Sequence, residues 1–257
     1  MMGGALVRGF LAAGVRLAGD IIAADADSSR REALVRECGI RAASDNAAAA
    51  GAAQTIILAV KPAIISAVIA EIAPVLHAGQ EVVSVAAGVP LRALQPAVEA
   101  GCSVFRVMPN TPCLVRAGAI AVAAGPEVGE GARRRVLALL GAVGQVIEVR
   151  ESLMDAVTGL SGSGPAYVFV FIEALADGGV AVGLPRATAL QLAAQTVLGA
   201  ARLLQETGKH PAALKDMVAS PGGTTIAGLA ALEEAGFRTA VIRAVQAAAK
   251  RSRELGQ

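Results

Sequence analysis

The sequence is poor in aromatic residues, and this scarcity limits the functions that it can support. Among 257 residues there are no tryptophans, one tyrosine and five phenylalanines. The net charge is only +2, and the basic residues are scattered apart from Arg133–Arg135 and Lys250–Arg253. Few rings are therefore available to stack on bases, and we expect no nucleic-acid binding.

Cysteine and histidine are also scarce. Cys38, Cys102 and Cys113 are odd in number and far apart, and the two histidines, His77 and His210, form no ligand pattern. Such spacing is typical of reduced thiols in a cytoplasmic protein, with neither a disulfide framework nor a metal site.

No apolar run has the length and composition of a membrane span. The closest run, 156–172, contains three glycines, a proline and several hydroxyl residues, which suit a buried helix better. No basic region precedes the first apolar residues, so we expect neither a signal peptide nor membrane association.

Short apolar segments alternate with helical patterns in the first 150 residues. Strands are expected at 20–25, 54–60, 81–86, 104–108, 119–123 and 146–149, and a helix capped by Ser28 is expected through Cys38. This alternation predicts an α/β fold, a parallel, doubly wound, Rossmann-like sheet in a domain of residues 1–150.

Residues 151–257 contain no strand pattern. Helices are expected at 165–182, 185–207, 211–218, after Gly223 and at 237–255, and the segment 166–172 is apolar on more than one face. A bundle of roughly 100 residues is too small to bury five such faces. We therefore expect an all-α dimerisation domain that forms a homodimer; the alternative is a loosely packed monomeric bundle.

Small and polar residues follow three of the predicted strands. They are Val60-Lys61-Pro62, Ala86-Ala87-Gly88 and the segment from Pro109 to Pro112, in which Asn110 offers an amide. Such turns are common singly. Three of them at the carboxyl ends of neighbouring strands predict a trough for a cofactor, with Lys61 near a phosphate or a cofactor edge.

The phosphate-binding fingerprint of a dinucleotide fold is incomplete. Met2, Gly3 and Gly4 resemble the end of a G-x-G-x-x-G turn, with Gly3 as its last glycine, but the first strand and first two glycines are absent. We expect the natural protein to be longer; the alternative is a fold that never had this strand.

The residues after the first predicted strand leave the choice between NADH and NADPH open. Asp25 favours a ribose 2′-hydroxyl, whereas Arg30 and Arg31 nearby favour a 2′-phosphate.

A turn rich in glycine precedes one of the C-terminal helices. Ser220-Pro221-Gly222-Gly223 cannot continue a helix, and Ile226, Leu229 and Leu232 then recur at helical spacing. The free N–H groups at such a helix start suit a small anion such as a carboxylate. The alternative is an ordinary helix cap.

The chain resembles the pyrroline-5-carboxylate reductase family, whose members catalyse the last step of proline biosynthesis. The resemblance runs nearly end to end, and its most specific part is the segment from Leu214 to Ile226. It also covers Leu58–Pro62, Val83–Gly88, Arg106–Pro112, Asp155–Tyr167 and Ala176–Gly179.

The resemblance implies an oxidoreductase that uses NADPH or NADH to reduce a cyclic imine carboxylate to proline. It implies that Ser220, Gly222, Gly223, Thr224 and Thr225 bind the substrate carboxylate, and that the Thr225 hydroxyl lies against the ring nitrogen. It places the Glu151 carboxylate near the substrate; without the resemblance, Glu151 would be interpreted as a carboxylate at a helix start.

The resemblance also implies the residues that bind the cofactor. Together with the strand-end analysis they are Met2, Gly3, Asn46, Ala59, Val60, Lys61, Pro62, Val85, Ala86, Ala87 and Asn110.

Two other functions are compatible with the residues. One is a dehydrogenase of the β-hydroxyacid type, which needs a catalytic Lys or His on the interdomain helix; Gly162–Pro165 is followed by no basic residue until Arg186. The other is an inactive oligomer that has lost its phosphate-binding loop.

Overall fold

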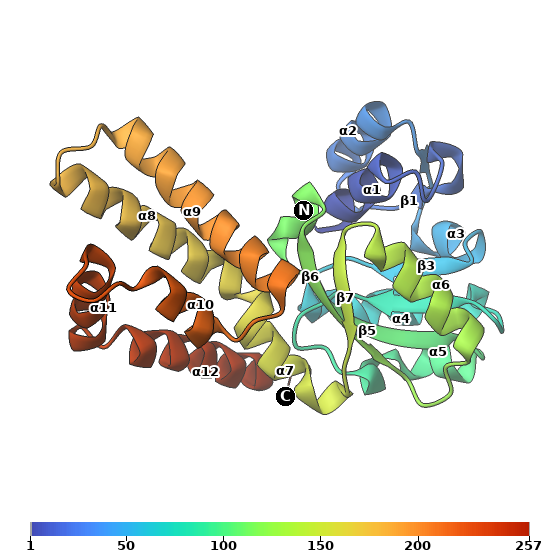
Figure 1. Cartoon of the computed structure of the whole chain (residues 1–257). Coiled ribbons are helices and arrows are strands. Elements are labelled where there is room, and N and C mark those ends of the chain that lie inside the picture. The colour runs from blue at the N-terminus through green and yellow to red at the C-terminus, as the bar shows by residue number, and fades with distance from the viewer. Residues whose placement is uncertain (1, 257) are drawn as a thin grey trace. The chain divides into compact units, whose positions relative to one another are not determined.

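A computed structural model describes residues 2–256, which form two compact units (Figure 1). The first unit runs to Ser163 and includes 246–256, and the second contains residues 164–245. The predicted α/β fold with an all-α C-terminal part is confirmed. The predicted functional boundary between residues 150 and 151 stays a prediction.

The first unit contains two separate sheets. The larger has the order β3 (Thr55–Leu58), β4 (Glu81–Ser84), β5 (Ser103–Met108), β6 (Gly118–Ala124) and β7 (Gly144–Glu148). The smaller pairs β1 (Ile22–Ala23) with β2 (Arg41–Ala42). Within residues 2–256 no strand joins the two sheets.

The larger sheet is mixed, so the expectation of a fully parallel sheet was wrong. β6 runs antiparallel to β5, while the other neighbours are parallel. The connection at 109–117 contains only a 3₁₀ turn, η5 (Thr111–Val115). A parallel crossover needs a dozen or more residues, and this segment is too short for one.

Helices cover both faces of the larger sheet. Val83, Phe105 and Val107 pack with α1 (Met2–Ala12) and α6 (Glu130–Gly141). Val82 and Val104 face the opposite layer, which contains α3 (Asn46–Gly51), α4 (Ile65–Ile72) and α5 (Gln95–Glu99). Neighbouring strand residues thus point to opposite layers, so these central strands are buried on both faces.

The helix α2 (Ser28–Cys38) begins one residue earlier than the predicted cap at Ser28 implies. The cap is Asp27, whose backbone is extended and whose side chain accepts hydrogen bonds from the N–H groups of Ser29 and Arg30. Ser28 is therefore the first helical residue, and the carboxylate outcompetes its hydroxyl for the free N–H groups.

The second unit is helical and has a small internal core. The chain enters it through α7 (Met154–Val157), a π-helical segment (Thr158–Gly162) and α8 (Gly164–Ala181). The remaining helices are α9 (Arg186–Thr207), α10 (Pro211–Val218), α11 (Thr224–Glu234) and α12 (Phe237–Leu255), whose end belongs to the first unit.

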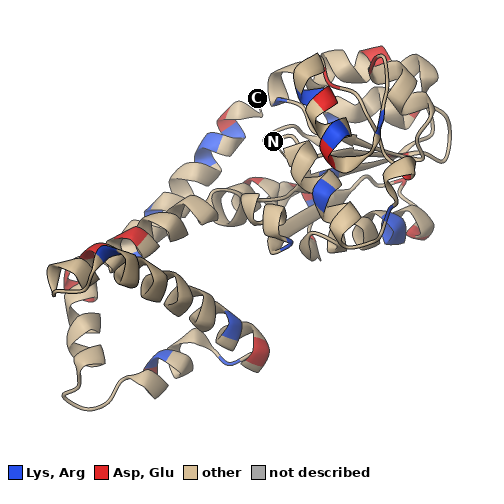
Figure 2. Cartoon of the chain, turned by 90° about the horizontal axis from the view of Figure 1, so that it is seen from above, with Lys and Arg blue, Asp and Glu red and all other residues tan. Residues whose placement is uncertain are grey.

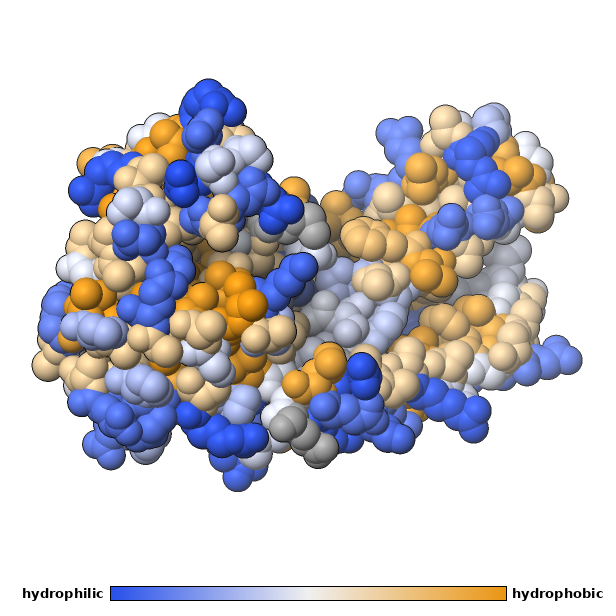
Figure 3. All heavy atoms as spheres, turned by 180° about the vertical axis from the view of Figure 1, so that it is seen from behind, coloured by the Kyte–Doolittle hydropathy of each residue, from blue (hydrophilic) through white to orange (hydrophobic). Residues whose placement is uncertain are grey.

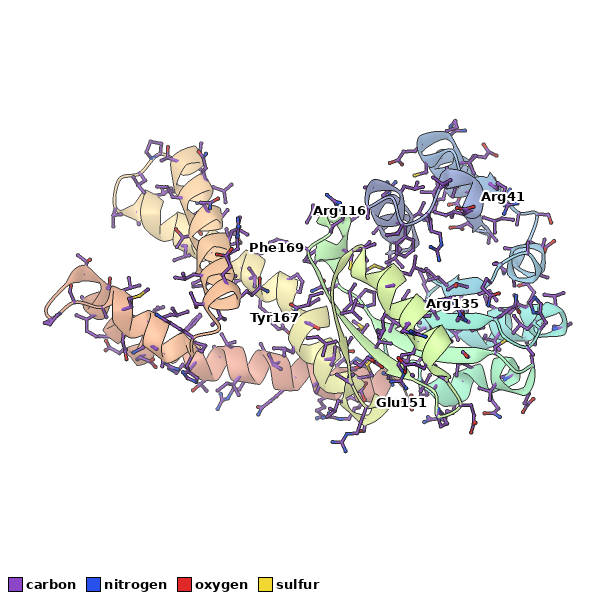
Figure 4. All side chains as sticks on the ribbon, turned by 45° about the vertical axis from the view of Figure 1, so that its right-hand side comes forward. Arg41, Arg116, Arg135, Glu151, Tyr167 and Phe169 are labelled. Carbon is purple, nitrogen blue, oxygen red and sulfur yellow. The ribbon has the colours of Figure 1, made fainter. Side chains whose placement is uncertain are left out.

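Small residues hold α8 and α9 together. The buried side chains of their interface are Ala176, Ala189 and Ala193. Large apolar side chains stay outside: Phe169 is 63% exposed and Val182 is 84% exposed. Figure 3 shows apolar residues on the surface of the helices, and Figure 4 shows Phe169 and Tyr167 on α8.

One helix, from Glu151 to Ala181, is long and apolar enough to cross a membrane by length and composition alone. Only 6% of its most apolar window is buried in the structure. The expectation that this stretch is a buried helix is therefore not met within a single chain. Figure 2 shows Lys and Arg interspersed with Asp and Glu along the ribbon of both units.

Candidate active site

The turns that follow β3, β4 and β5 emerge at one edge of the larger sheet. These strands are parallel neighbours, in which Leu58 pairs with Ser84 and Ser84 with Arg106. The edge contains seven of the residues predicted to bind the cofactor: Ala59, Val60, Lys61, Pro62, Val85, Ala86 and Ala87. The carboxyl ends of parallel strands are where such folds bind ligands.

The start of α1 reaches the same edge. A Cβ atom added to Gly3 would lie 3.1 Å from the Cβ of Ala59, so the helix backbone and the end of β3 approach closely. Met2 packs against the core cluster that α1 shares with α6. The first turn of α1 contains no acidic residue, so its N–H groups suit a phosphate.

Two asparagines predicted to touch the cofactor have partners within the protein. The Asn46 amide, at the start of α3, donates to Glu71 Oε2 at 2.8 Å. Asn110 is buried; its Nδ2 donates to the Ser161 carbonyl and its Oδ1 accepts from the Ala119 N–H, both at 3.0 Å. These bonds give Asn110 a structural task, and its role toward a cofactor stays a prediction.

Glu151, labelled in Figure 4, lies beside the Arg106 side chain in the first unit. Its Oε1 accepts the backbone N–H of Leu91 at 2.6 Å and lies 3.6 Å from the Arg106 guanidinium. Arg106 also contacts Asp155 at 3.4 Å, and the Ser252 hydroxyl donates to Asp155 at 2.8 Å. A pocket of ≈ 400 Å³ adjoins this cluster. Glu151 thus fixes the start of a 3₁₀ turn at Leu91, and its role near a substrate stays a prediction.

The sequence interpretation assigned no role to Arg106, Asp155 or Ser252. The Arg106 side chain is only 7% exposed, on a strand whose flanking residues Phe105 and Val107 are core. A single arginine within the apolar segment 104–108 is the signal that could have identified the cluster, because a buried charge needs a partner.

In the second unit, Ser220–Gly223 form a tight turn before α11. The Gly223 N–H donates to the Ser220 carbonyl at 3.1 Å, and Gly222 has φ +66°. Proline at the second position and a left-handed glycine at the third are the residues of a type II turn. A Cβ on Gly223 would lie 2.3 Å from Ser220 Oγ and 3.2 Å from the Ser220 carbonyl oxygen, so a larger residue here would force the Ser220 side chain to rotate.

The N-terminus of α11 has no capping side chain. Its cap residue is Gly223, and no acidic residue lies in the first turn. The backbone N–H groups of Thr224 and Thr225 are therefore left to an external acceptor or to solvent. Thr225 is half-buried, whereas Ser220 and Thr224 are exposed. Gly223 caps the helix without a side chain, a geometry that suits a carboxylate. The choice between an anion site and an ordinary helix cap stays a prediction.

Within residues 2–256, no three His, Cys, Asp or Glu side chains are grouped so that they could hold a metal ion.

Known proteins similar to the chain share both of its parts. Residues 151–255 match the pyrroline-5-carboxylate reductase dimerisation family, and residues 1–88 match the NADP oxidoreductase, coenzyme F420-dependent family. A pyrroline-5-carboxylate reductase of Synechocystis is 53% identical over 81% of this chain and 78% of its own length. The chain belongs to the pyrroline-5-carboxylate reductase family.

Solved pyrroline-5-carboxylate reductases have the same fold. The Coxiella burnetii structure covers 100% of this chain and 95% of its own, with a TM-score of 0.92 and 35% identity. The Plasmodium falciparum structure, which has NADP bound, covers the same shares with a TM-score of 0.86 and 32% identity. The predicted family and fold are therefore confirmed, and the chain is an oxidoreductase by family.

Proposed function

We propose that the chain reduces 1-pyrroline-5-carboxylate to proline with NADPH, as the last step of proline biosynthesis. The observation that carries this proposal is the uncapped N-terminus of α11, combined with membership of a family whose named members are such reductases. The substrate carries a carboxylate, and this helix start offers backbone N–H groups without a competing acid.

The residues at the sheet edge suit a dinucleotide. The first turn of α1 would hold the phosphates, with Lys61 as a cation at the edge, and the small side chains Ala59, Ala86 and Ala87 leave its backbone approachable by a flat ring. Bound NADPH supplies a hydride for the carbon of the C=N bond. Asn46, Val60, Pro62 and Val85 complete the proposed cofactor site.

The protein itself supplies orientation and a proton donor. The N–H groups of Gly223, Thr224 and Thr225 hold the substrate carboxylate, with Ser220 and Gly222 shaping the turn. The Thr225 hydroxyl hydrogen-bonds the ring nitrogen and passes to it a proton that the hydroxyl regains from solvent, which gives the iminium. Hydride addition then turns the C=N bond into a C–N bond. An iminium accepts hydride readily, so a fixed anion site and correct orientation can provide most of the catalysis. Glu151, in the first unit, is the second polar group that we assign to the reaction.

The proposed protein is a homodimer or higher oligomer, formed through α8 and α9 and present in the cytoplasm. The family of residues 151–255 is described as a dimerisation family, and large apolar side chains of these helices are exposed in one chain. The three cysteines are free, as suits a reducing compartment.

The experiment follows NADPH absorbance with the purified protein and 1-pyrroline-5-carboxylate. Wild type and Thr225→Ser oxidise NADPH, while Thr225→Ala lowers kcat by roughly 10²-fold, the usual contribution of a positioned proton donor. Wild-type rates in both Thr225→Ala and Glu151→Ala would overturn the site assignment. Absence of any turnover in wild type would favour an inactive oligomer.

A further inference from the structure

The helix that leads from the first unit to the second contains an irregular segment. Between α7 and α8, residues Thr158–Gly162 are π-helical, and the Ser163 N–H donates to the Thr158 carbonyl at 2.9 Å, five residues back. π-helical turns within α-helices often mark functional sites. Pro165 follows this segment, in the first turn of α8.

Pro165 removes a hydrogen bond from this helix. In a regular α-helix the carbonyl of Ser161 would accept the N–H of the residue four positions later, which is Pro165 and has none. The Asn110 Nδ2 donates to this carbonyl at 3.0 Å instead. Asn110 thus replaces the donor that proline lacks.

The other end of the Asn110 amide anchors it to the sheet. Asn110 lies two residues after β5, and its Oδ1 accepts the N–H of Ala119 in β6. The residue is 8% exposed, so losing either bond leaves a buried polar group unpaired.

The segment also packs closely on the end of β5. A Cβ on Gly162 would lie 2.4 Å from the Met108 Cε, so the helix backbone and this side chain are in contact. The irregular helix is thereby held at the strand end that precedes Asn110.

We infer that Asn110 is a positioning residue, whose amide fixes the π-helical segment Thr158–Gly162 to the end of β5 and the start of β6. Its amide donates to the Ser161 carbonyl in place of the N–H that Pro165 lacks. This inference rests on the proposed function in one respect. Turnover is proposed to need residues of both units, whereas NADPH binding is proposed to need residues of the first unit alone. Loosening the segment then lowers kcat and leaves NADPH affinity unchanged. If Asn110 instead contacted the cofactor directly, its loss would raise the Kd of NADPH.

The test is a double-mutant cycle of Asn110→Ala and Pro165→Ala. Hydrogen exchange of the amides in residues 158–166 reports the segment without any activity. We expect Asn110→Ala to speed this exchange by about tenfold, equivalent to one buried hydrogen bond, and to lower kcat. Pro165→Ala restores a backbone N–H that can donate to the Ser161 carbonyl. The double variant therefore recovers at least half of the lost exchange protection and at least half of the lost kcat. The Kd of NADPH stays within about twofold of wild type.

Two results would overturn the inference. One is an unchanged exchange rate at 158–166 with a raised Kd of NADPH in Asn110→Ala. The other is no recovery on adding Pro165→Ala. If Asn110→Ala does not fold, Asn110→Asp keeps the acceptor for Ala119 and removes the donor to Ser161, and the same cycle applies. If wild type itself does not turn over 1-pyrroline-5-carboxylate, the proposed function fails, while the exchange cycle still decides the role of Asn110.

Discussion

At the scale of single residues, the buried cysteines are chemically protected rather than reactive. Cys102 and Cys113 lie in the core of the first unit, and Cys38 is half-buried at the end of α2. Burial raises the pKa of all three thiols above the ordinary value, because the thiolate loses its solvation. Less thiolate exists at neutral pH, so reaction with electrophiles is slow.

We therefore predict that N-ethylmaleimide at pH 7 labels Cys38 first and leaves Cys102 and Cys113 unmodified in the folded protein. Mass spectrometry before and after denaturation counts the modified thiols, and all three react once the chain is unfolded. Raising the pH through the elevated pKa values speeds labelling. Rapid labelling of Cys113 at pH 7 would show that the Cys113 thiol is accessible to solvent rather than buried.

We predict that two arginines at the start of α2 make the protein prefer NADPH to NADH. The Arg31 guanidinium donates to the Asp25 carbonyl at 3.0 Å, and Arg30 pairs with Asp27. Both cations lie just after β1, where a 2′-phosphate is recognised in such folds. Replacing both by alanine raises the Kd of NADPH about tenfold, the effect of losing a charge-assisted contact, with the Kd of NADH unchanged.

Arg36→Ala is the matched control, since Arg36 lies on the same helix but pairs with Glu32 away from its start. Calorimetric titration with each nucleotide gives the constants. Equal losses for NADPH and NADH would mean that these arginines do not read the 2′-phosphate.

At the scale of elements, the turn before α11 carries the substrate prediction. Gly223→Ala places a methyl group against Ser220 Oγ and 3.2 Å from the Ser220 carbonyl oxygen, so the Ser220 side chain must rotate and the turn is crowded where the carboxylate would bind. We predict a raised KM for 1-pyrroline-5-carboxylate with a smaller change in kcat, and partial recovery when Ser220→Ala removes the opposing hydroxyl.

Gly228→Ala provides the control within the same helix. Nothing lies within 4 Å of a Cβ at this position, so the substitution stabilises α11 by about 1 kcal/mol and leaves KM unchanged. A KM that is the same in Gly223→Ala and wild type would exclude this turn as the carboxylate site.

The elements that the sequence predicted well are those with strong local patterns. Apolar strands such as β3, β4 and β5, and helices bounded by proline such as α9 and α10, lie within a few residues of their expected positions. The π-helical segment was not predicted, and the Asn110 side chain that donates to the Ser161 carbonyl within it is remote in sequence.

Ion pairs between residues far apart in the chain could not be predicted from the sequence for the same reason. Nothing local indicates that Arg106 contacts Glu151 and Asp155, or that Ser252 near the C-terminus bonds Asp155. The antiparallel β6 was also missed, although the short connection 109–117 contained the information. The Ser220–Gly223 turn was predictable because proline and glycine fix its backbone locally.

At the scale of the whole molecule, the exposed apolar side chains of α8 and α9 predict that the protein forms an oligomer. Phe169 on α8 is 63% exposed and Leu198 on α9 is 52% exposed. Apolar surface of this extent is typical of an interface. The double variant Phe169→Glu, Leu198→Glu reduces the molar mass in light scattering to that of one chain.

Leu17→Glu is the control for this experiment. Leu17 is 73% exposed but belongs to the first unit, so its replacement leaves the oligomer intact. A wild-type protein that is monomeric at micromolar concentration would contradict the proposed assembly.

The central claim is that the chain transfers a hydride from a nicotinamide to a cyclic imine carboxylate. The most direct measurement incubates it with 1-pyrroline-5-carboxylate and NADPH carrying deuterium at the transferred position of C4, and analyses the product by mass spectrometry. The account predicts proline one mass unit heavier, with the deuterium on C5, formed in step with NADPH loss. Absence of proline, or proline without deuterium from either face of the nicotinamide, would contradict it.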